Sequence, residues 1–209
     1  DGLAVAGRVG AQLCEAALAS PGVGEVFTAT VRAIEDRNAA ALARLMSLAE
    51  AEAASATGLL SAFGWVSAAS LRGITKELLS SRSAFQRQVG LAACGMHQAD
   101  PGAALDAALN DADPALRCRA LRVAGELGRI DALPRCLRAL AEPAGPVNDT
   151  LRFHAARSAL LLGDRGLSAA ALERLAETPG TQPTQALDLW LMVASPEQAH
   201  ATLKRIAQK

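Results

Sequence analysis

Residues 113–142 read DPALRCRALRVAGELGRIDALPRCLRALAE, a sequence typical of two helices joined by a short turn. Its first half has the pattern of a helix that begins at Asp113-Pro114. The carboxylate can accept hydrogen bonds from the first amides, and proline lacks the N–H that would go unpaired there. Apolar residues then recur at helical spacing: Leu116, Ala120, Val123, Ala124 and Leu127. Gly128 suits the left-handed end of such a helix, so we expect a helix over residues 113–128.

A second helix is expected directly after the first, over residues 131–142. Asp131 is placed to cap it. Leu133, Leu137 and Leu140 are expected to form its buried face. Neither helix can bury its apolar stripe alone, so the two must pack on each other and on neighbouring helices.

The same two-helix unit returns further along the chain. An offset of 35 residues relates the first helices of the two units, matching Leu116, Arg117, Ala120, Ala124 and Gly128 with Leu151, Arg152, Ala155, Ala159 and Gly163. The second helices keep this offset, and an offset of 31 extends the pattern in both directions. A period of this length indicates an α-solenoid. The expected helix pairs are 56–69 with 70–81, 83–98 with 101–111, 113–128 with 131–142, 147–163 with 166–177, and 183–194 with 195–208.

The N-terminal part of the chain fits the repeat less well. Residues 1–55 are expected to form two or three helices, broken at Ser20-Pro21-Gly22 and near Asp36, that cover the exposed face of the first repeat. We therefore expect an N-terminal helical cap over residues 1–55 and a repeat array over residues 56–209, in one continuous structural domain.

The composition supports an all-α fold and excludes several classes of function. Of the 209 residues, 51% are hydrophobic and 3% aromatic, with no tyrosine, which is unlike a β protein. With 21 basic and 21 acidic side chains the formal net charge is zero, so the bulk charge does not attract nucleic acid. The uncharged run from Ala53 to Leu71 is rich in Ala, Ser and Gly, and we expect no membrane insertion.

The residue types that usually carry chemistry occur here without a catalytic pattern. His97, His154 and His200 lack a second ligand at metal-binding spacing. The four cysteines occur singly in helical contexts, which favours a reducing compartment and cytoplasmic localisation. Trp65 and Trp190 fall at apolar positions and are expected in the core. We therefore expect no enzyme activity, no catalytic residues, no metal and no cofactor.

The stretch 113–140 resembles a known repeat family. Its pattern D-P-x-L-R-x-x-A-x-x-x-x-x-x-L-G followed by D-A-L-P-x-x-L-x-A-L is similar to the HEAT-like repeat of bilin lyases. The resemblance implies a right-handed α-solenoid of about five helix pairs, with the second helices lining a concave face. Together with FGWVSAASLRG at 63–73 and GLAACGMHQADPGAALDAAL at 90–109, the chain also resembles an uncharacterised proteobacterial HEAT-like family. Genes of that family often lie near those for type VI secretion components.

Arginine-rich second helices give the sequence its functional hint. On the repeat geometry, five basic residues approach the concave side and are candidates for partner binding: Arg135, Arg138, Arg174, Lys204 and Arg205. Arg117 and Arg152 occupy the repeat's own arginine position and are expected to form hydrogen bonds between repeats. The leading hypothesis is a non-enzymatic protein-interaction scaffold with a protein partner, and the second resemblance implies that it is accessory to type VI secretion. The alternative is an enzyme or a nucleic-acid-binding module with its site in the groove.

Overall fold

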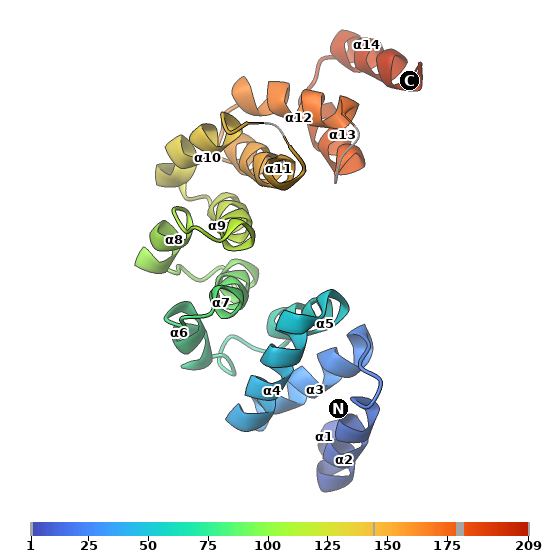
Figure 1. Ribbon diagram of the computed structural model, residues 1–209, viewed down its shortest axis with the longest axis vertical. Coiled ribbons are helices and arrows are strands. Elements are labelled where there is room, and N and C mark those ends of the chain that lie inside the picture. Colours follow the sequence, from blue (N-terminus) through green and yellow to red (C-terminus); the bar gives the residue numbers. More distant parts are fainter. Residues whose placement is uncertain (1, 144, 179–181, 209) are drawn as a thin grey trace. The chain divides into compact units, whose positions relative to one another are not determined.

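Helices make up the regular structure of the computed structural model, which describes residues 2–143, 145–178 and 182–208 and shows no strand among them. Figure 1 shows the helices following one another along the chain, which confirms the all-α class. In chain order they are α1 (Gly2–Val5), α2 (Gly7–Ala17), α3 (Val23–Glu35), α4 (Ala39–Ala51), α5 (Ala53–Trp65), α6 (Ile74–Leu79), α7 (Ala84–Met96), α8 (Ala103–Ala108), α9 (Pro114–Glu126), the 3₁₀ helix η1 (Ile130–Ala132), α10 (Leu133–Leu140), α11 (Pro146–Leu161), α12 (Leu167–Glu177), α13 (Pro183–Leu191) and α14 (Pro196–Ala207).

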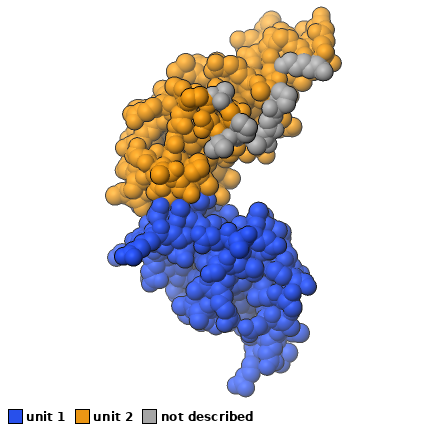
Figure 2. Space-filling view, in the orientation of Figure 1, with its two compact units in different colours: residues 1–101 blue, residues 102–209 orange. Residues whose placement is uncertain are grey.

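The chain divides into two compact units, unit 1 over residues 1–101 and unit 2 over residues 102–209 (Figure 2). This division reflects the density of packing within each unit. The sequence predicts a different kind of division, based on which segments share the repeat: a cap over residues 1–55 and an array over residues 56–209. That division stays a prediction.

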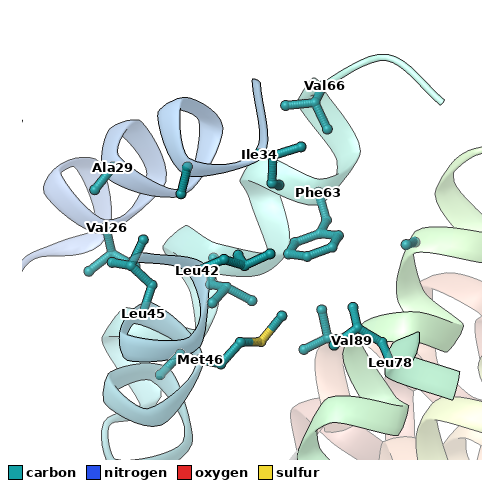
Figure 3. Close-up of a cluster of buried hydrophobic side chains, with 14 of the residues drawn as sticks. Val26, Ala29, Ile34, Leu42, Leu45, Met46, Phe63, Val66, Leu78 and Val89 are labelled. Atoms are coloured by element: carbon teal, nitrogen blue, oxygen red, sulfur yellow. The ribbon is translucent and has the colours of Figure 1, made fainter. Parts of the chain in front are cut away.

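Unit 1 is built around the crossing of α3 and α5. The two helices approach closely because Gly58 has no side chain: a Cβ there would lie 2.3 Å from the carbonyl oxygen of Val23. Helix α4 packs on both of them, and α6 packs on α7. Figure 3 shows the buried side chains that fill the space between these helices, among them Val26, Phe63 and Val89. Burial of this apolar surface is the main term that stabilises the unit.

Unit 2 contains the helix pairs in two layers. Helix α9 packs against α11, and α10 packs against α12, while α11 also contacts α10 and α12. Consecutive helices therefore alternate between a layer of α9, α11 and α13 and a layer of α8, α10 and α12 (Figure 1). Within unit 2 the layer of α9, α11 and α13 lies on the inner side of the curve that the other layer follows. The resemblance implied the reverse, with second helices on the inner side.

Several helix ends form as their sequence signals predict. The carboxylate of Asp113 accepts a hydrogen bond of 2.7 Å from the backbone N–H of Leu116, which caps α9. Ser195 forms a full capping box at the start of α14. Gly128 and Gly163 follow α9 and α11 with φ of 65° and 101°, a region that glycine enters without strain.

The start of α10 differs from the prediction. Asp131 lies inside η1, where its carboxylate accepts hydrogen bonds from the Arg129 guanidinium, and α10 begins without a side-chain cap. The expected buried face of this helix is also rotated. Leu133, Leu137 and Leu140 are half-buried, whereas Cys136 and Ala139 are buried. The helix presents its small residues to its neighbours because α10 packs closely against α11 and α12.

Small residues mark the closest packing of the first helices. Ala93, Ala124 and Ala159 share one register position of the repeat, and all three are buried, as the sequence predicts. One residue along from Ala124, Gly125 faces α11, where Ser158 donates a hydrogen bond of 2.7 Å to the carbonyl oxygen of Leu121. The repeat alanines thus lie at positions with no room for a larger side chain.

No helix in the described part of the chain has both the length and the apolar character needed to span a bilayer. The uncharged run that begins at Ala53 ends its helix at Trp65 and continues into turns.

Candidate functional site

The five basic residues predicted to bind a partner lie on three helices of unit 2. Arg135 and Arg138 are on α10, Arg174 is on α12, and Lys204 and Arg205 are on α14. The structure therefore places the first two on one helix, and it connects the last to α12 through ion pairs.

Two of the five are engaged within the unit. Arg135 forms an ion pair of 2.9 Å with Asp106. Arg205 contacts Glu173 at 2.7 Å and Glu177 at 2.6 Å, and these hydrogen bonds, chiefly the one to Glu177, raise the pKa of the Arg205 guanidinium. Their charges are thus largely compensated before any partner arrives.

The other three are exposed. Arg138, Arg174 and Lys204 form no ion pair with another residue in the described ranges. Arg174 donates one hydrogen bond of 3.2 Å to the carbonyl oxygen of Ala170, in its own helix. These three side chains stay candidates for partner binding.

The repeat arginines act within a repeat. Arg117 pairs with Glu142, which ends the same two-helix unit. Arg152 pairs with Asp149, one turn earlier on α11, at 3.5 Å. In place of the expected hydrogen bonds between repeats, Arg117 forms an ion pair within its helix pair and Arg152 forms one within α11.

The two tryptophans have opposite environments. Trp190 is 3% exposed, which confirms its expected place in the core. Trp65 is 75% exposed, so the prediction of a buried indole was wrong there. It is the last residue of α5, and its ring meets that of Phe27 edge-on with the centroids 6.1 Å apart. At a helix end the neighbouring turn covers less of a side chain than in mid-helix, so the helical spacing alone did not bury it.

Three of the four cysteines are poor nucleophiles. Burial raises the pKa of the Cys94, Cys118 and Cys136 thiols to about 11. At neutral pH such thiols hold almost no reactive thiolate. Among the residues that the structure describes, no group of three or more His, Cys, Asp or Glu side chains could hold a metal ion.

A hollow opens on the layer of α9, α11 and α13. Its cavity has a volume of about 400 Å³. We call it the register hollow, because polar residues that line it occupy matching positions of the repeat. It is lined by Arg122, Phe153, His154, Arg157, Gln182, Gln185, Asp188 and Leu189. The mixture of cationic, amide and apolar groups is typical of a binding surface.

Glu126 is the acidic partner of the arginines beside this hollow. It accepts a hydrogen bond of 2.8 Å from Arg122 and one of 3.3 Å from Arg157. One turn before Arg122, Arg119 adds a third guanidinium group. Burial lowers the pKa of Arg119, and the neighbouring charge of Arg122 lowers it further. Positive charge is therefore in excess on this part of the surface.

His154 is held neutral by these surroundings. Burial lowers the pKa of its imidazole to about 4, with smaller contributions from Arg122, Arg119 and Arg157. Its Nδ1 is buried without a hydrogen-bond partner, and so are Nη1 of Arg157 and Oε1 of Gln182. Buried polar atoms without partners are uncommon in native proteins and mark places where a ligand or water completes the structure.

The register hollow was missed by the sequence reasoning, although the repeat carries a signal for it. The offset of 35 residues that relates Ala124 to Ala159 also relates Arg122 to Arg157 and Arg119 to His154. The offset of 31 then continues from Arg157 to Asp188 and from His154 to Gln185. Following the polar positions of the repeat, and not its apolar positions alone, would have brought these residues together.

The hollow is equipped to hold a polar or anionic group. Its lining residues offer guanidinium and amide donors and one carboxylate, and no cysteine, serine or lysine lies among those that the structure describes. Such a set of groups can bind a ligand through charge and hydrogen bonds. Comparisons with protein-family models, with curated proteins and with solved structures find no match for this chain.

Proposed function

We propose that this chain is a non-enzymatic protein-interaction scaffold, an α-solenoid of HEAT-like helix pairs that binds a protein partner on the layer of α9, α11 and α13. The observation that carries the proposal is the register hollow. Polar side chains from the same repeat positions of three successive first helices converge on one open surface. Repeat arrays present extended binding surfaces in this way, because each repeat contributes the same position to one continuous face.

The chemistry of the side chains supports binding over catalysis. Thiols with a pKa near 11 are unsuited to nucleophilic attack at neutral pH. His154, with its pKa lowered to about 4, is a weak base near neutrality. A balanced net charge also favours a protein partner over nucleic acid.

The cellular setting is part of the proposal and rests on the family resemblance of the sequence. We propose a bacterial, cytoplasmic protein that works beside type VI secretion components. The exposed Arg138, Arg174 and Lys204 are proposed as a second, weaker contact surface, because exposed charges steer a partner more than they hold it.

Site-specific cross-linking in the source cell tests the main proposal. A photo-reactive benzoylphenylalanine replaces Gln185, which is exposed at the hollow, and in a matched control it replaces Arg174, which is exposed on α12. We expect a defined protein to be cross-linked from position 185 and identified by mass spectrometry. Filling the hollow with Gln185→Trp should abolish retention of that protein in a pull-down, whereas the double variant Arg138→Ala/Arg174→Ala should retain most of it.

Two other results would contradict the proposal. Cross-linking from position 174 alone would move the partner to the α10 and α12 surface predicted from the sequence. Salt-sensitive retention of DNA or RNA, with no cross-linked protein, would favour the alternative of a nucleic-acid-binding module.

A further inference from the structure

The arginines at the register hollow share too few acidic partners. Three guanidinium groups, those of Arg119, Arg122 and Arg157, lie around His154. Two carboxylates are near them: Glu126, which pairs with Arg122 and Arg157, and Asp188, which lines the hollow. Glu126 is divided between Arg122 and Arg157, and its contact with Arg157 is the longer, at 3.3 Å. One positive charge is therefore left without a carboxylate.

Arg157 holds an unused donor at this place. Its Nη2 contacts Glu126, while its Nη1 is buried and has no hydrogen-bond partner. A guanidinium group presents its N–H donors in a rigid planar fork that matches the two oxygens of a carboxylate. Because the side chains of Arg157 and Glu126 are 26% and 23% exposed, a charge placed there is screened less than on an open surface.

From these contacts we propose that the register hollow receives the carboxylate of an aspartate or glutamate side chain of the protein partner, with Arg157 and Arg122 as its ligands. The inference rests on the proposed function, since it names the part of the partner that the hollow recognises. The incoming carboxylate compensates the excess positive charge beside Glu126, to which Arg157 makes the longer of the two arginine contacts.

The charge of the hollow favours a carboxylate over a phosphate group. A single uncompensated positive charge matches a monoanion, while Asp188 and Glu126 repel a dianion at close range. Stacking of a nucleobase is disfavoured too, because Phe153, the aromatic ring of the lining, is 5% exposed. An acidic peptide is therefore the ligand class that fits.

His154 supplies an internal reporter of binding. In the free protein the groups that face it are Arg119, Arg122 and Glu126 from α9, Arg157 from its own helix, and Gln185 and Asp188 from α13. The three cations keep its imidazole neutral, in addition to burial. A bound carboxylate opposes these cations, so it must raise the pKa of His154.

The test is a titration of the full chain with an acetylated and amidated hexaglutamate peptide, followed by NMR of the histidine ring protons. The His154 signals are assigned with the variant His154→Gln. At pH 5.5 we expect the peptide to move these signals toward the imidazolium position, corresponding to a rise of one pKa unit or more. An uncharged peptide of alternating serine and glycine should leave them in place.

Matched variants locate the effect. Arg157→Gln and Arg122→Gln should each weaken peptide binding at least tenfold, and Arg122 is exposed, so its variant should keep the wild-type melting curve. Arg165→Gln removes another exposed arginine of unit 2, one that lies outside the hollow, and should leave the affinity unchanged.

Several outcomes would overturn the inference. They are unchanged His154 signals with the peptide, tighter binding of inorganic phosphate than of the peptide, or an equal loss of affinity in Arg165→Gln. The result is separable from that for the proposed function. If a partner is still cross-linked from position 185 in Arg157→Gln and Arg122→Gln, the scaffold proposal is supported and the carboxylate site is contradicted. If the peptide binds but no partner is cross-linked, the carboxylate site is supported and the scaffold proposal is contradicted.

Discussion

Gly125 and Ser158 are in direct contact across the interface of α9 and α11. A Cβ on Gly125 would lie 2.6 Å from Oγ of Ser158 and 2.8 Å from its Cα. The Ser158 hydroxyl is committed to the carbonyl oxygen of Leu121, at 2.7 Å, and is buried. Neither the side chain nor the backbone of Ser158 has room to move aside, so the distance between these two helices depends on the absence of a side chain at residue 125.

Gly125→Ala should destabilise unit 2. Alanine favours a helix over glycine by about 1 kcal/mol, but overpacking of a close interface costs about 1–3 kcal/mol, so we expect a net loss of stability. Gly24→Ala, on α3, places its methyl group where no atom lies within 4 Å and should be neutral or stabilising. Urea unfolding of the two variants measures the difference. Equal unfolding midpoints would show that α9 and α11 separate at little cost.

Ala124→Leu tests the register position of the repeat alanines. Ala124 is fully buried, and we expect the larger side chain to cost about 1–3 kcal/mol and to lower Tm by several degrees. Leucine is a good helix former, so helix propensity cannot account for such a loss. Ala115→Leu, at an exposed position of the same helix, should stay within about 0.5 kcal/mol of wild type. A melting curve of Ala124→Leu that superimposes on that of the wild type would contradict the packing described here.

Asp113 and Asp131 look alike in sequence and should differ in effect. Asp113→Ala removes the hydrogen bond to the Leu116 amide and should cost about 1 kcal/mol. Asp131→Ala removes a contact with Arg129 at the surface, and such exposed pairs often contribute nothing measurable to stability. Thermal melts of both variants at pH 7 compare them. A larger loss of stability in Asp131→Ala than in Asp113→Ala would favour the original prediction that Asp131 caps the second helix.

His154 should make the stability of the folded protein depend on pH between about 6.5 and 4. Its pKa is about 4 when folded and about 6.5 in an unfolded chain, so the unfolded state binds the proton first as the pH falls. The contribution of His154 to the stability of the folded protein is therefore present above pH 6.5 and is lost as the pH falls toward 4. Between pH 7 and pH 5 we expect the wild type to lose about 1–2 kcal/mol more than His154→Gln. Parallel loss in the two proteins over this range of pH would show that His154 does not carry the effect.

The helix pairs were predictable because their signals are local. The cap at Asp113 and the left-handed end at Gly128 depend on residues a few positions apart, and each forms as expected. The buried register of Ala93, Ala124 and Ala159 follows from the repeat itself, since a residue packs alike wherever its unit recurs.

Features that depend on neighbouring helices were harder to predict. The apolar leucines of α10 gave no sign that the buried face of this helix would centre on Cys136, because that choice depends on how closely α11 and α12 approach. The candidate site shows the same limit. In the sequence, nothing distinguishes Arg122 and Arg157 from other arginines on the polar faces of helices. They form a site because both contact Glu126, one from α9 and the other from α11. The exposed indole of Trp65 likewise depends on its place at the end of α5.

The unlike environments of the two tryptophans give the molecule a built-in optical probe. Trp65 belongs to unit 1 and already lies in water, whereas Trp190 belongs to unit 2 and lies in its core. Unfolding changes the solvent around Trp190 far more than around Trp65, so a red shift of the intrinsic fluorescence reports chiefly on unit 2. Circular dichroism follows the helices of both units. Comparing the two signals during denaturation therefore reveals whether the halves of the chain melt in a single transition or in succession.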